Sequence, residues 1–306
     1  MLKYFNFPYD FQIENFVTEL FLHEKFKPFE NHKVHFYGCY PKWKTYYKSY
    51  VYFRSRRSNE FMSKWLAHGY GVPDNVDDSA FNIWITFENR RPLIEKFDLT
   101  ISFDLDEYGG RNFYFPLLYF YTSLSSNPKL AWKHLVSQDE LTNRREISDI
   151  NINKKIKTVA LFMNNPHPVR MNAFQLLRNY VDVEGYGRFF NKYAENKIEV
   201  LEKYWMNLCF ENDLYPGYVT EKILESWLAF SVPLYWGWDY SGILNKNAFL
   251  NLVDYSGIEN FCADVNELSR NPTKMKQMIS EPLLNKKVDL ERFSNFIYTG
   301  LKKKFG

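Results

Sequence analysis

The stretch "YWMNLCFENDLYPGYVTEKILESWLAFSVPLYWG", residues 204–237, predicts one complete strand–helix–strand unit. Its first part is an apolar run that ends in Phe-Glu-Asn at 210–212 and leads into a loop with proline and glycine. In the segment 220–230 that follows, the apolar residues recur along one helical stripe, namely Ile223, Leu224, Trp227 and Leu228. The short apolar run "VPLYWG", which begins at 232, predicts the second strand. A strand, a helix and a strand in this order indicate parallel strands joined by a crossover helix.

The segment 157–183 shows the same organisation. "KTVALFM" at 157–163 is a near-continuous apolar run, typical of a strand covered on both faces of its sheet. "NNPHP" interrupts the run, and "VRMNAFQLLRNY" at 169–180 has helical spacing. "VDV" at 181–183 predicts another short strand. Two such units in succession predict a doubly wound α/β domain of the nucleotide-binding type.

The first half of the chain also alternates between strands and helices. "KVHFYG" at 33–38, "FNIWITFEN" at 81–89 and "FDLTISFD" at 97–104 predict strands, while segments such as "EFMSKWLAHGY" have helical spacing. This alternation predicts a second α/β domain with a parallel sheet. The stretch 139–157 is highly charged and poorly periodic, which is typical of a linker between domains. The predicted organisation is an N-terminal domain, a second domain and a C-terminal segment, at 1–150, 151–275 and 276–306.

Composition narrows the class of protein. The chain has 306 residues, of which 45% are hydrophobic and 19% aromatic, enough to bury two cores rather than remain disordered. Its net charge of +3 disfavours a nucleic-acid binder. The three cysteines, Cys39, Cys209 and Cys262, match no metal motif, so we expect free thiols in a reducing compartment. With no signal peptide and no run of 18 apolar residues, we expect a cytoplasmic protein, either free or peripheral to the inner face of a membrane.

Two polar segments follow predicted strands, and ligands of open α/β sheets bind at such strand ends. They are "NNPHPVR" at 164–170 and "FENDLYPGYVTEK" at 210–222. Arg170 and Lys222 each lie in the first turn of a predicted helix, where the helix dipole favours an acid rather than a cation. An anion bound between them would explain this placement, and the alternative is that both side chains face solvent. The sequence contains no GxGxxG or GxxxxGK[ST] motif, so it does not indicate an NAD or P-loop site.

Three further features each have two interpretations. Asp104 and Asp106 form a DxD pair that a metal-dependent sugar transferase could use, but such pairs are short and common. The stretch 42–57, "KWKTYYKSYVYFRSRR", holds six cations, six aromatic residues and no acid. It is either a loop that meets sugars or a membrane, or an element with a solvated basic face. The end of the chain, "FSNFIYTGLKKKFG" at 293–306, either touches anionic lipid or packs back on the N-terminal domain.

The segment "FENDLYPGYVTEKILESWLAFSVPLYWGW" strongly resembles the signature of the α1,3/4-fucosyltransferase family, in which F-E-N-S precedes Y-[IV]-T-E-K, a helix and V-P-[IV]-x-x-G. "NNPHPVR" resembles the family's S-N-x-x-x-x-R block, and "VDVEGYG" with "FFN" resembles its V-D-x-x-G block. Upstream, "ITFENRRP" and "FDLTISFD" resemble its T-G-E-N and F-D-Y-x-I-x-F-D blocks. The resemblance covers residues 80–260. Asp213 replaces the family's serine, and Phe87 replaces a glycine on the acceptor side.

The resemblance implies a GT-B fold, with two Rossmann-like domains facing across a cleft. It also implies an inverting, metal-independent transfer of L-fucose from GDP-β-L-fucose, with no cofactor. The expected acceptor is a glycan hydroxyl such as GlcNAc O3 of an N-acetyllactosamine-type chain or a lipopolysaccharide. Glu88 would be the catalytic base, unless it is a helix cap or an ion-pair partner of Arg90 or Arg91. The donor would be bound by phosphate-binding Arg170 and Lys222, by Glu221 at the ribose hydroxyls, and by Asn212, Tyr218 and Thr220, which shape the pocket.

Two other functions remain open from the sequence. The same fold could use a different nucleotide sugar, because no motif identifies the hexose. The chain could also be a non-catalytic relative that binds glycans, although the presence of Glu88, Arg170, Glu221 and Lys222 argues against it. In either case the expected partners are a nucleotide-sugar donor and a glycan acceptor, with peripheral contact to a membrane or glycolipid left open and no nucleic acid.

Overall fold

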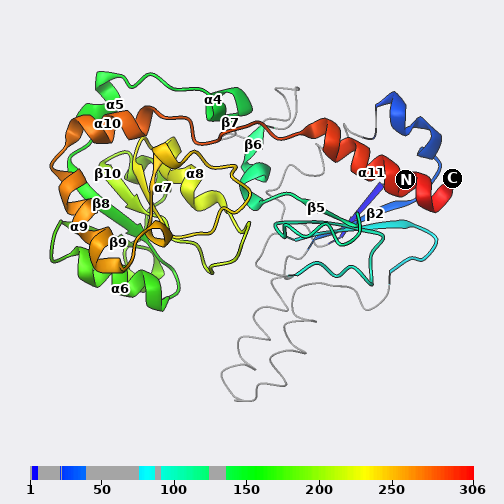
Figure 1. Cartoon of the computed structure of the whole chain (residues 1–306), viewed down its shortest axis with the longest axis horizontal. Helices are drawn as coiled ribbons and strands as arrows, with labels where there is room; N and C mark the ends of the chain where they lie inside the picture. The colour runs from blue at the N-terminus through cyan, green and yellow to red at the C-terminus, as the bar shows by residue number, and fades with distance from the viewer. Residues whose placement is uncertain (1, 6–20, 22, 39–75, 87–90, 124–135) are drawn as a thin grey trace, which may run out of the picture. The chain divides into compact units, whose positions relative to one another are not determined.

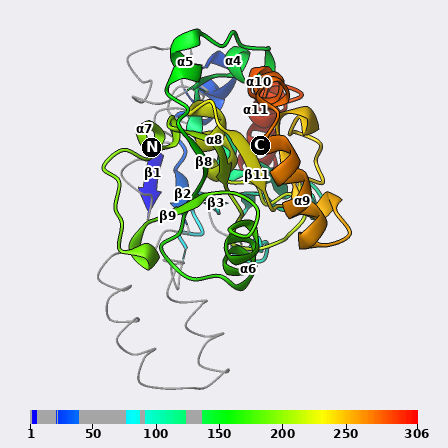
Figure 2. The ribbon, with the colours of Figure 1, turned by 90° about the vertical axis from the view of Figure 1, so that its left-hand side faces the viewer.

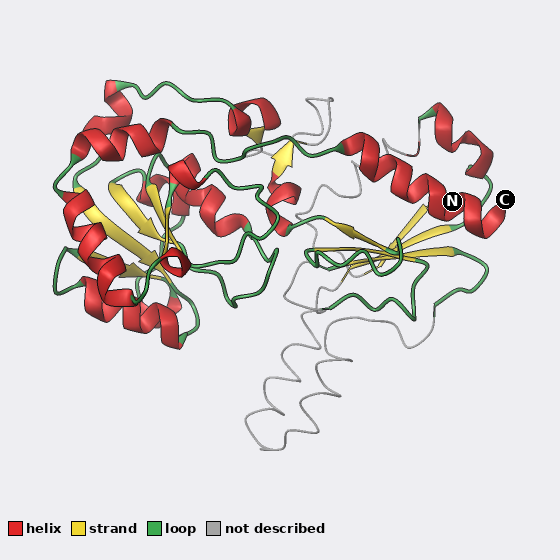
Figure 3. Cartoon of the chain, in the orientation of Figure 1, coloured by secondary structure: helices red, strands yellow, loops and turns green. Residues whose placement is uncertain are grey.

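Two compact units make up the chain (Figure 1). The structure is a computed structural model, and it describes residues 2–5, 21, 23–38, 76–86, 91–123 and 136–306. The first unit contains 1–135 together with 289–306, and the second contains 136–288. Each unit has its own parallel sheet with helices packed on it, as expected for two α/β domains (Figure 3).

The first unit is built on five parallel strands. In spatial order, which is also chain order, these are β1 (Leu2–Phe5), β2 (Val34–Gly38), β3 (Phe81–Ile85), β4 (Leu99–Ser102) and β5 (Asn112–Tyr114). Every residue of β2, β3 and β4 is buried, as in strands covered on both faces of a sheet. The buried residues include the polar side chains of His35, Asn82, Thr100 and Ser102. Among its described residues, the unit also contains the short elements η1 (Glu24–Phe29), η2 (Leu117–Tyr121) and β6 (Thr122–Ser123).

The long C-terminal helix α11 (Leu290–Phe305) packs against this first sheet. Its buried stripe is Phe293, Ile297 and Leu301, spaced three to four residues apart. Gly300 allows the close approach, because a Cβ at this position would lie 2.7 Å from the side chains of Leu99 and Phe81. Ion pairs from Arg292 to Glu107 and from Lys304 to Asp98 flank the contact. The C-terminal segment thus packs back on the first unit.

The second unit is doubly wound around a five-stranded parallel sheet in the order β12-β11-β10-β8-β9. The strands are β8 (Lys157–Phe162), β9 (Val183–Tyr186), β10 (Tyr204–Leu208), β11 (Val232–Tyr235) and β12 (Leu250–Asn251). From β8 the chain adds β9 on one side and then β10, β11 and β12 on the other. The direction of winding therefore reverses at β8, and such a reversal opens a crevice for ligands at the carboxyl ends of the neighbouring strands β8 and β10.

Helices cover both faces of this sheet. One face packs on α6 (Pro168–Leu177), α9 (Ile258–Ser269) and α10 (Pro272–Ser280), with a core that includes Val159, Leu161, Met206 and Leu234. The other face carries α7 (Lys197–Leu201) and α8 (Glu221–Leu228), which contact each other. Figure 2 shows α7 and α9 on opposite sides of the strands. The remaining elements are β7 (Val136–Ser137), α4 (Gln138–Thr142), α5 (Asp149–Asn153), η4 (Arg188–Phe190), η5 (Lys246–Ala248) and η6 (Leu252–Asp254).

The unit boundaries differ from the predicted ones. The charged stretch 139–157 was predicted to be a linker, with domains divided at 150/151 and 275/276, but it lies inside the second unit. It contains two short helices, α4 and α5, each begun by a serine capping box. Arg145 inserts between the rings of Trp227 and Phe230, 3.7 and 4.0 Å from their centroids. A cation–π contact of this kind anchors the stretch to α8, so the chain divides at 135/136 and 288/289 instead.

Among the helices that the structure describes, none is both long and apolar enough to cross a membrane. Cys209 and Cys262 are free and buried, and Cys39 lies outside the described residues. The stretch 42–57 also lies outside them.

Candidate functional site

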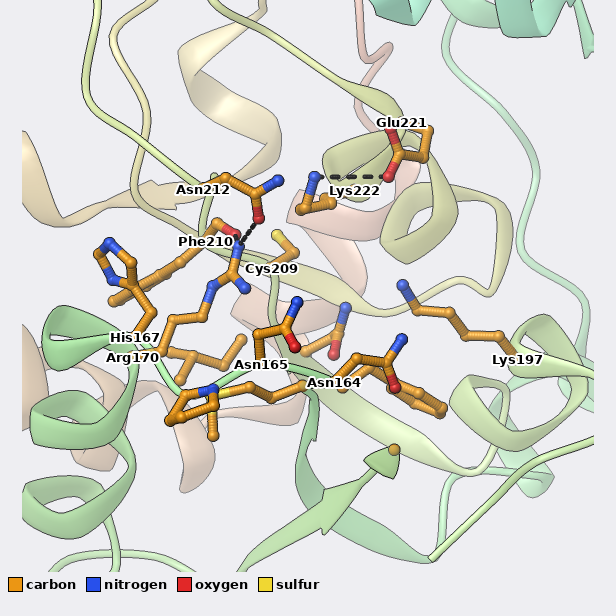
Figure 4. A pocket seen from close by; sticks show the side chains of 16 residues that line it. Asn164, Asn165, His167, Arg170, Lys197, Cys209, Phe210, Asn212, Glu221 and Lys222 are labelled. Atoms are coloured by element: carbon orange, nitrogen blue, oxygen red, sulfur yellow. Dashed lines mark hydrogen bonds and ion pairs between the residues drawn. The ribbon is translucent and has the colours of Figure 1, made fainter. Parts of the chain in front are cut away.

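A pocket of about 490 Å³ lies in the second unit where the crevice is expected (Figure 4). Its walls come from the end of β8 and the following loop, from the end of β10 and its loop, and from the first turns of α6 and α8. Gly187 and Lys197 complete the lining. The volume falls in the ordinary range of ligand pockets. Both polar segments that the sequence placed at strand ends therefore meet at one site.

Arg170 forms one side of this pocket. It is the third residue of α6 and is only 7% exposed. Its Nη2 donates to the carbonyl oxygen of Phe210 and to Oδ1 of Asn212, both at 2.7 Å (Figure 4). Burial lowers the pKa of Arg170, while the nearby carboxylate of Glu211 opposes this shift. The guanidinium is thus fixed in place between α6 and the loop after β10.

Glu211 holds the loop between β10 and α8 in place through a buried carboxylate. Its side chain has no exposed surface and accepts four hydrogen bonds. Oε1 accepts from the backbone N–H of Thr220 at 2.8 Å and from the hydroxyl of Tyr235 at 3.0 Å. Oε2 accepts from the hydroxyl of Thr220 at 2.7 Å and from Nζ of Lys222 at 3.3 Å. The sequence placed Glu211 with Asn212 on the donor side but gave it no role of its own, because these hydrogen bonds depend on how the loop folds against α8 and β11.

Lys222 and Glu221 occupy the first turn of α8. Nζ of Lys222 lies 2.8 Å from Oγ1 of Thr220 and 3.4 Å from Oε1 of Glu221. Burial alone would lower the pKa of Lys222, but the carboxylates of Glu211 and Glu221 outweigh it and raise that pKa. Burial likewise works to raise the pKa of Glu221, yet Lys222 keeps the net shift downward. Both groups are therefore charged near neutral pH.

The predicted donor-binding residues divide into two groups. Arg170, Asn212, Glu221 and Lys222 all line the pocket. Tyr218 and Thr220 are 2% and 1% exposed and are not part of the lining. Thr220 acts instead by holding Glu211 and Lys222 in position.

Glu88, the predicted base, lies outside the described residues, as does Phe87. Asp104 and Asp106, the DxD pair, are placed in a turn of the first unit. Asp104 accepts from the Tyr108 hydroxyl at 2.9 Å, and Asp106 accepts from the Tyr108 N–H at 2.8 Å. Across the part of the chain that the structure describes, no group of three His, Cys, Asp or Glu side chains could hold a metal ion.

Four other lining residues were not among the predicted site residues. The ring of His167 lies tilted against that of Trp236, with centroids 5.6 Å apart, and burial together with Arg170 lowers the pKa of His167. Gly187 has a φ of +100°, and a Cβ there would lie 2.6 Å from the Met163 carbonyl oxygen, so only glycine fits this wall. Burial raises the pKa of Cys209 to about 12, which keeps its thiol protonated and unreactive. The fourth is Lys197, at the start of α7.

The charge of the lining indicates what the pocket can bind. Arg170, Lys197 and Lys222 are cations, and Glu221 is the only acid among the lining residues that the structure describes. Preset cations of this kind bind phosphate oxygens through charge-assisted hydrogen bonds. They also stabilise the negative charge that develops on a departing diphosphate.

Residues 152–280, which include this pocket, match the model of glycosyltransferase family 10 (fucosyltransferase), C-terminal part. An α-(1,3)-fucosyltransferase, FucT, of Helicobacter pylori is 27% identical over 229 residues, covering 68% of this chain and 48% of the relative. The human 4-galactosyl-N-acetylglucosaminide 3-α-L-fucosyltransferase FUT6 is 30% identical over 132 residues, covering 40% of this chain and 36% of the relative. The chain thus spans less than half the length of these curated relatives.

Solved structures share the fold. A crystal structure of an α1,3-fucosyltransferase covers 98% of this chain and 89% of its own, with a TM-score of 0.62 at 19% identity. A crystal structure of an α1,3-fucosyltransferase with GDP covers 80% of this chain and 88% of its own, with a TM-score of 0.60 at 22% identity. These similarities confirm the predicted GT-B fold class.

Proposed function

We propose that this chain is a fucosyltransferase of glycosyltransferase family 10 and that it transfers L-fucose from GDP-β-L-fucose to a glycan hydroxyl. The observation that carries the proposal is the pocket of the second unit. It brings Arg170, Lys222 and Glu221 together at the strand ends, inside the segment that the family model matches. These are the residues that the resemblance assigns to a nucleotide diphosphate.

The donor would bind with its diphosphate between Arg170 and Lys222. Arg170 already donates to two fixed oxygens, so its guanidinium is oriented before the donor arrives. Lys222 is held by Glu211 and Thr220 in the same way. Glu221, 24% exposed at its side chain, would accept from the ribose hydroxyls. Such preorganised groups stabilise the charge of the leaving group without reorganising during the reaction.

The transfer would proceed by inversion. The acceptor hydroxyl oxygen forms a bond to the anomeric carbon of fucose while the bond from that carbon to the β-phosphate oxygen breaks. GDP leaves with the electron pair of the broken bond, and the hydroxyl proton passes to a base, for which we propose Glu88. The cations of the pocket would take the place of a metal ion, so the reaction would need none.

For the acceptor we propose O3 of GlcNAc in an N-acetyllactosamine-type or lipopolysaccharide chain. The support comes from the relatives, since the human enzyme is named for a 4-galactosyl-N-acetylglucosaminide and the bacterial one for α-(1,3) transfer. Phe87 stands where the family has a glycine, and we expect this larger side chain to restrict which acceptors fit.

A donor panel tests the proposal. GDP-fucose, GDP-mannose, UDP-galactose and UDP-GlcNAc are each supplied with N-acetyllactosamine, and the released nucleotide and glycan product are measured. We expect product with GDP-fucose alone, and a higher melting temperature with GDP but not with UDP. Product with a UDP-sugar would assign the fold to a different donor, and binding of GDP without any product would indicate a non-catalytic relative.

A further inference from the structure

Lys197 lies at the opposite side of the pocket from Arg170 and Asn212 (Figure 4). It is the first residue of α7, and its Nζ pairs with Oε2 of Glu225 on α8. The same Nζ lies 5.2 Å from the ring centroid of Phe162, another lining residue. The side chain of Lys197 keeps 30% of its surface exposed, so its ammonium is held in place yet open to the pocket.

A buried hydrogen-bond acceptor lies on the same face of the sheet. Asn207 of β10 is 2% exposed, lines the pocket, and donates from Nδ2 to the hydroxyl oxygen of Ser226 at 2.8 Å. The Ser226 hydroxyl donates its one proton to the Lys222 carbonyl at 3.1 Å, and in this arrangement it accepts from Asn207, which assigns the orientation of the amide. Oδ1 of Asn207 then has no partner among the described residues. A buried oxygen without a donor is costly, and a ligand N–H would relieve that cost.

The position of Lys197 along the pocket suggests which part of a ligand it meets. On the proposed function, the diphosphate lies at Arg170 and Lys222 and the ribose at Glu221. The nucleobase then extends beyond the ribose, away from Arg170, toward the end of the pocket that Lys197 closes.

We propose that Lys197 is the residue that selects a 6-oxopurine base, by donating from Nζ to O6 and N7. This inference rests on the proposed function and deepens it. Guanine presents both atoms as acceptors on one edge, whereas adenine presents N7 beside an amino group that would repel an ammonium. The next atom around the guanine ring, N1, carries a hydrogen that suits an acceptor such as Oδ1 of Asn207. Glu225 is the positioning residue, since it holds Nζ of Lys197 before the base arrives.

Binding of a matched set of nucleotides tests this assignment. GDP, IDP, 7-deaza-GDP, ADP and UDP are titrated by calorimetry into the wild-type chain and into Lys197→Met and Lys197→Arg. We expect Lys197→Met to weaken GDP and IDP about 10- to 100-fold and to leave ADP unchanged, which is the discrimination that one such base contact provides. Lys197→Arg should retain most of the preference for GDP over ADP. 7-deaza-GDP, which lacks the N7 acceptor, should bind more weakly than GDP to the wild type and to Lys197→Arg. It should bind as well as GDP to Lys197→Met, which has no cation at this position.

Lys154→Met is the matched control, because Lys154 forms a 2.7 Å ion pair with Glu202 and is not part of the pocket lining. It should bind every nucleotide as the wild type does. An equal loss for GDP and ADP in Lys197→Met would place Lys197 at the phosphates or ribose and overturn the assignment, as would unchanged GDP binding. If the wild type itself prefers UDP, the proposed GDP-sugar donor is wrong. If the wild type prefers GDP but Lys197→Met does not change that preference, only the role of Lys197 is wrong, so the two failures are distinguishable.

Discussion

Replacing Glu211 by Gln should destabilise the second unit through one buried contact. Each oxygen of the Glu211 carboxylate accepts from two donors. A glutamine side chain could satisfy the donors at only one of these two positions, so only one orientation of its amide is tolerable. The amide oxygen must stay at Oε1, because the backbone N–H of Thr220 cannot turn away. The new NH₂ then replaces Oε2 and faces Nζ of Lys222, which is also a donor. The hydroxyl of Thr220 can rotate to accept, but the ammonium cannot.

The expected magnitude follows from that single conflict. A hydrogen bond to a charged group contributes roughly 1.5–3 kcal/mol, and breaking a buried ion pair costs about 3–5 kcal/mol when one charge is stranded. Lys222 keeps Glu221 and Thr220 as partners, so we expect a loss of about 2–4 kcal/mol in the free energy of unfolding. For a unit of this size that corresponds to a melting temperature lower by about 5–15 °C.

The assay is thermal and urea unfolding of Glu211→Gln beside Glu225→Gln. Glu225 also pairs with a lysine, Lys197, but its side chain is 27% exposed, whereas that of Glu211 has no exposed surface. Water can therefore solvate the charge that Glu225→Gln leaves on Lys197, so we expect a smaller loss, toward the roughly 0–1 kcal/mol of surface pairs. Glu225→Gln should therefore unfold nearly as the wild type does. If Glu211→Gln is equally harmless, the buried carboxylate does not organise the loop after β10, and Lys222 must be held in place by other groups.

The remaining predictions concern activity and pH. Arg170→Ala and Lys222→Ala should each lower kcat about 10²–10³-fold with GDP-fucose, since each removes a group that stabilises the leaving diphosphate, and near wild-type turnover in either would contradict this. Glu88→Gln should keep GDP affinity in calorimetry and lower turnover about 10²–10⁴-fold, whereas unchanged turnover would assign the base elsewhere. Activity should survive excess EDTA, and a strict need for Mn²⁺ would refute metal independence. Burial lowers the pKa of Lys155 in the folded chain to about 7, from the usual 10.5. Between pH 7 and pH 10.5 the unfolded chain therefore binds one more proton at Lys155 than the folded chain does, so stability should rise with pH over this range. Lys155→Met should flatten that rise in urea unfolding measured from pH 7 to pH 10, and an unchanged slope would assign it to another group.

Much of the second unit could be predicted because its strands and helices carry local signals. The run at 157–163 became β8, and the stripe at 220–230 became α8. The strand predicted at 181–183 lies instead at Val183–Tyr186, because Gly185 belongs to β9 rather than ending it. A Cβ at Gly185 would lie 2.5 Å from the ring of Phe190, so this glycine makes room for a side chain and does not mark a turn.

The site was predictable only in part, because only some of its residues have local sequence signals. Arg170 and Lys222 lie in the first turns of helices that follow predicted strands, and the carboxyl ends of parallel strands meet at one edge of a sheet. Lys197 follows no such rule, since it reaches the pocket only because α7 packs beside α8 and Glu225 holds it there. Arg145 shows the same limit, because no local pattern reveals that a charged residue will lie between two aromatic rings.

The placement of the two pocket cations links stability to ligand binding. Arg170 and Lys222 lie in the first turns of α6 and α8, where the helix dipole disfavours positive charge. Neighbouring oxygens offset part of this cost: the Phe210 carbonyl and Asn212 amide at one cation, and Glu211 at the other. The outcome differs between the two cations, because the carboxylates raise the pKa of Lys222 whereas burial lowers that of Arg170. The charge of Arg170 therefore carries a net cost in the unliganded second unit, and a bound diphosphate would offset it while also attracting Lys222 and both helix starts. Since these attractions are electrostatic, GDP should raise the melting temperature more in low salt than in high salt.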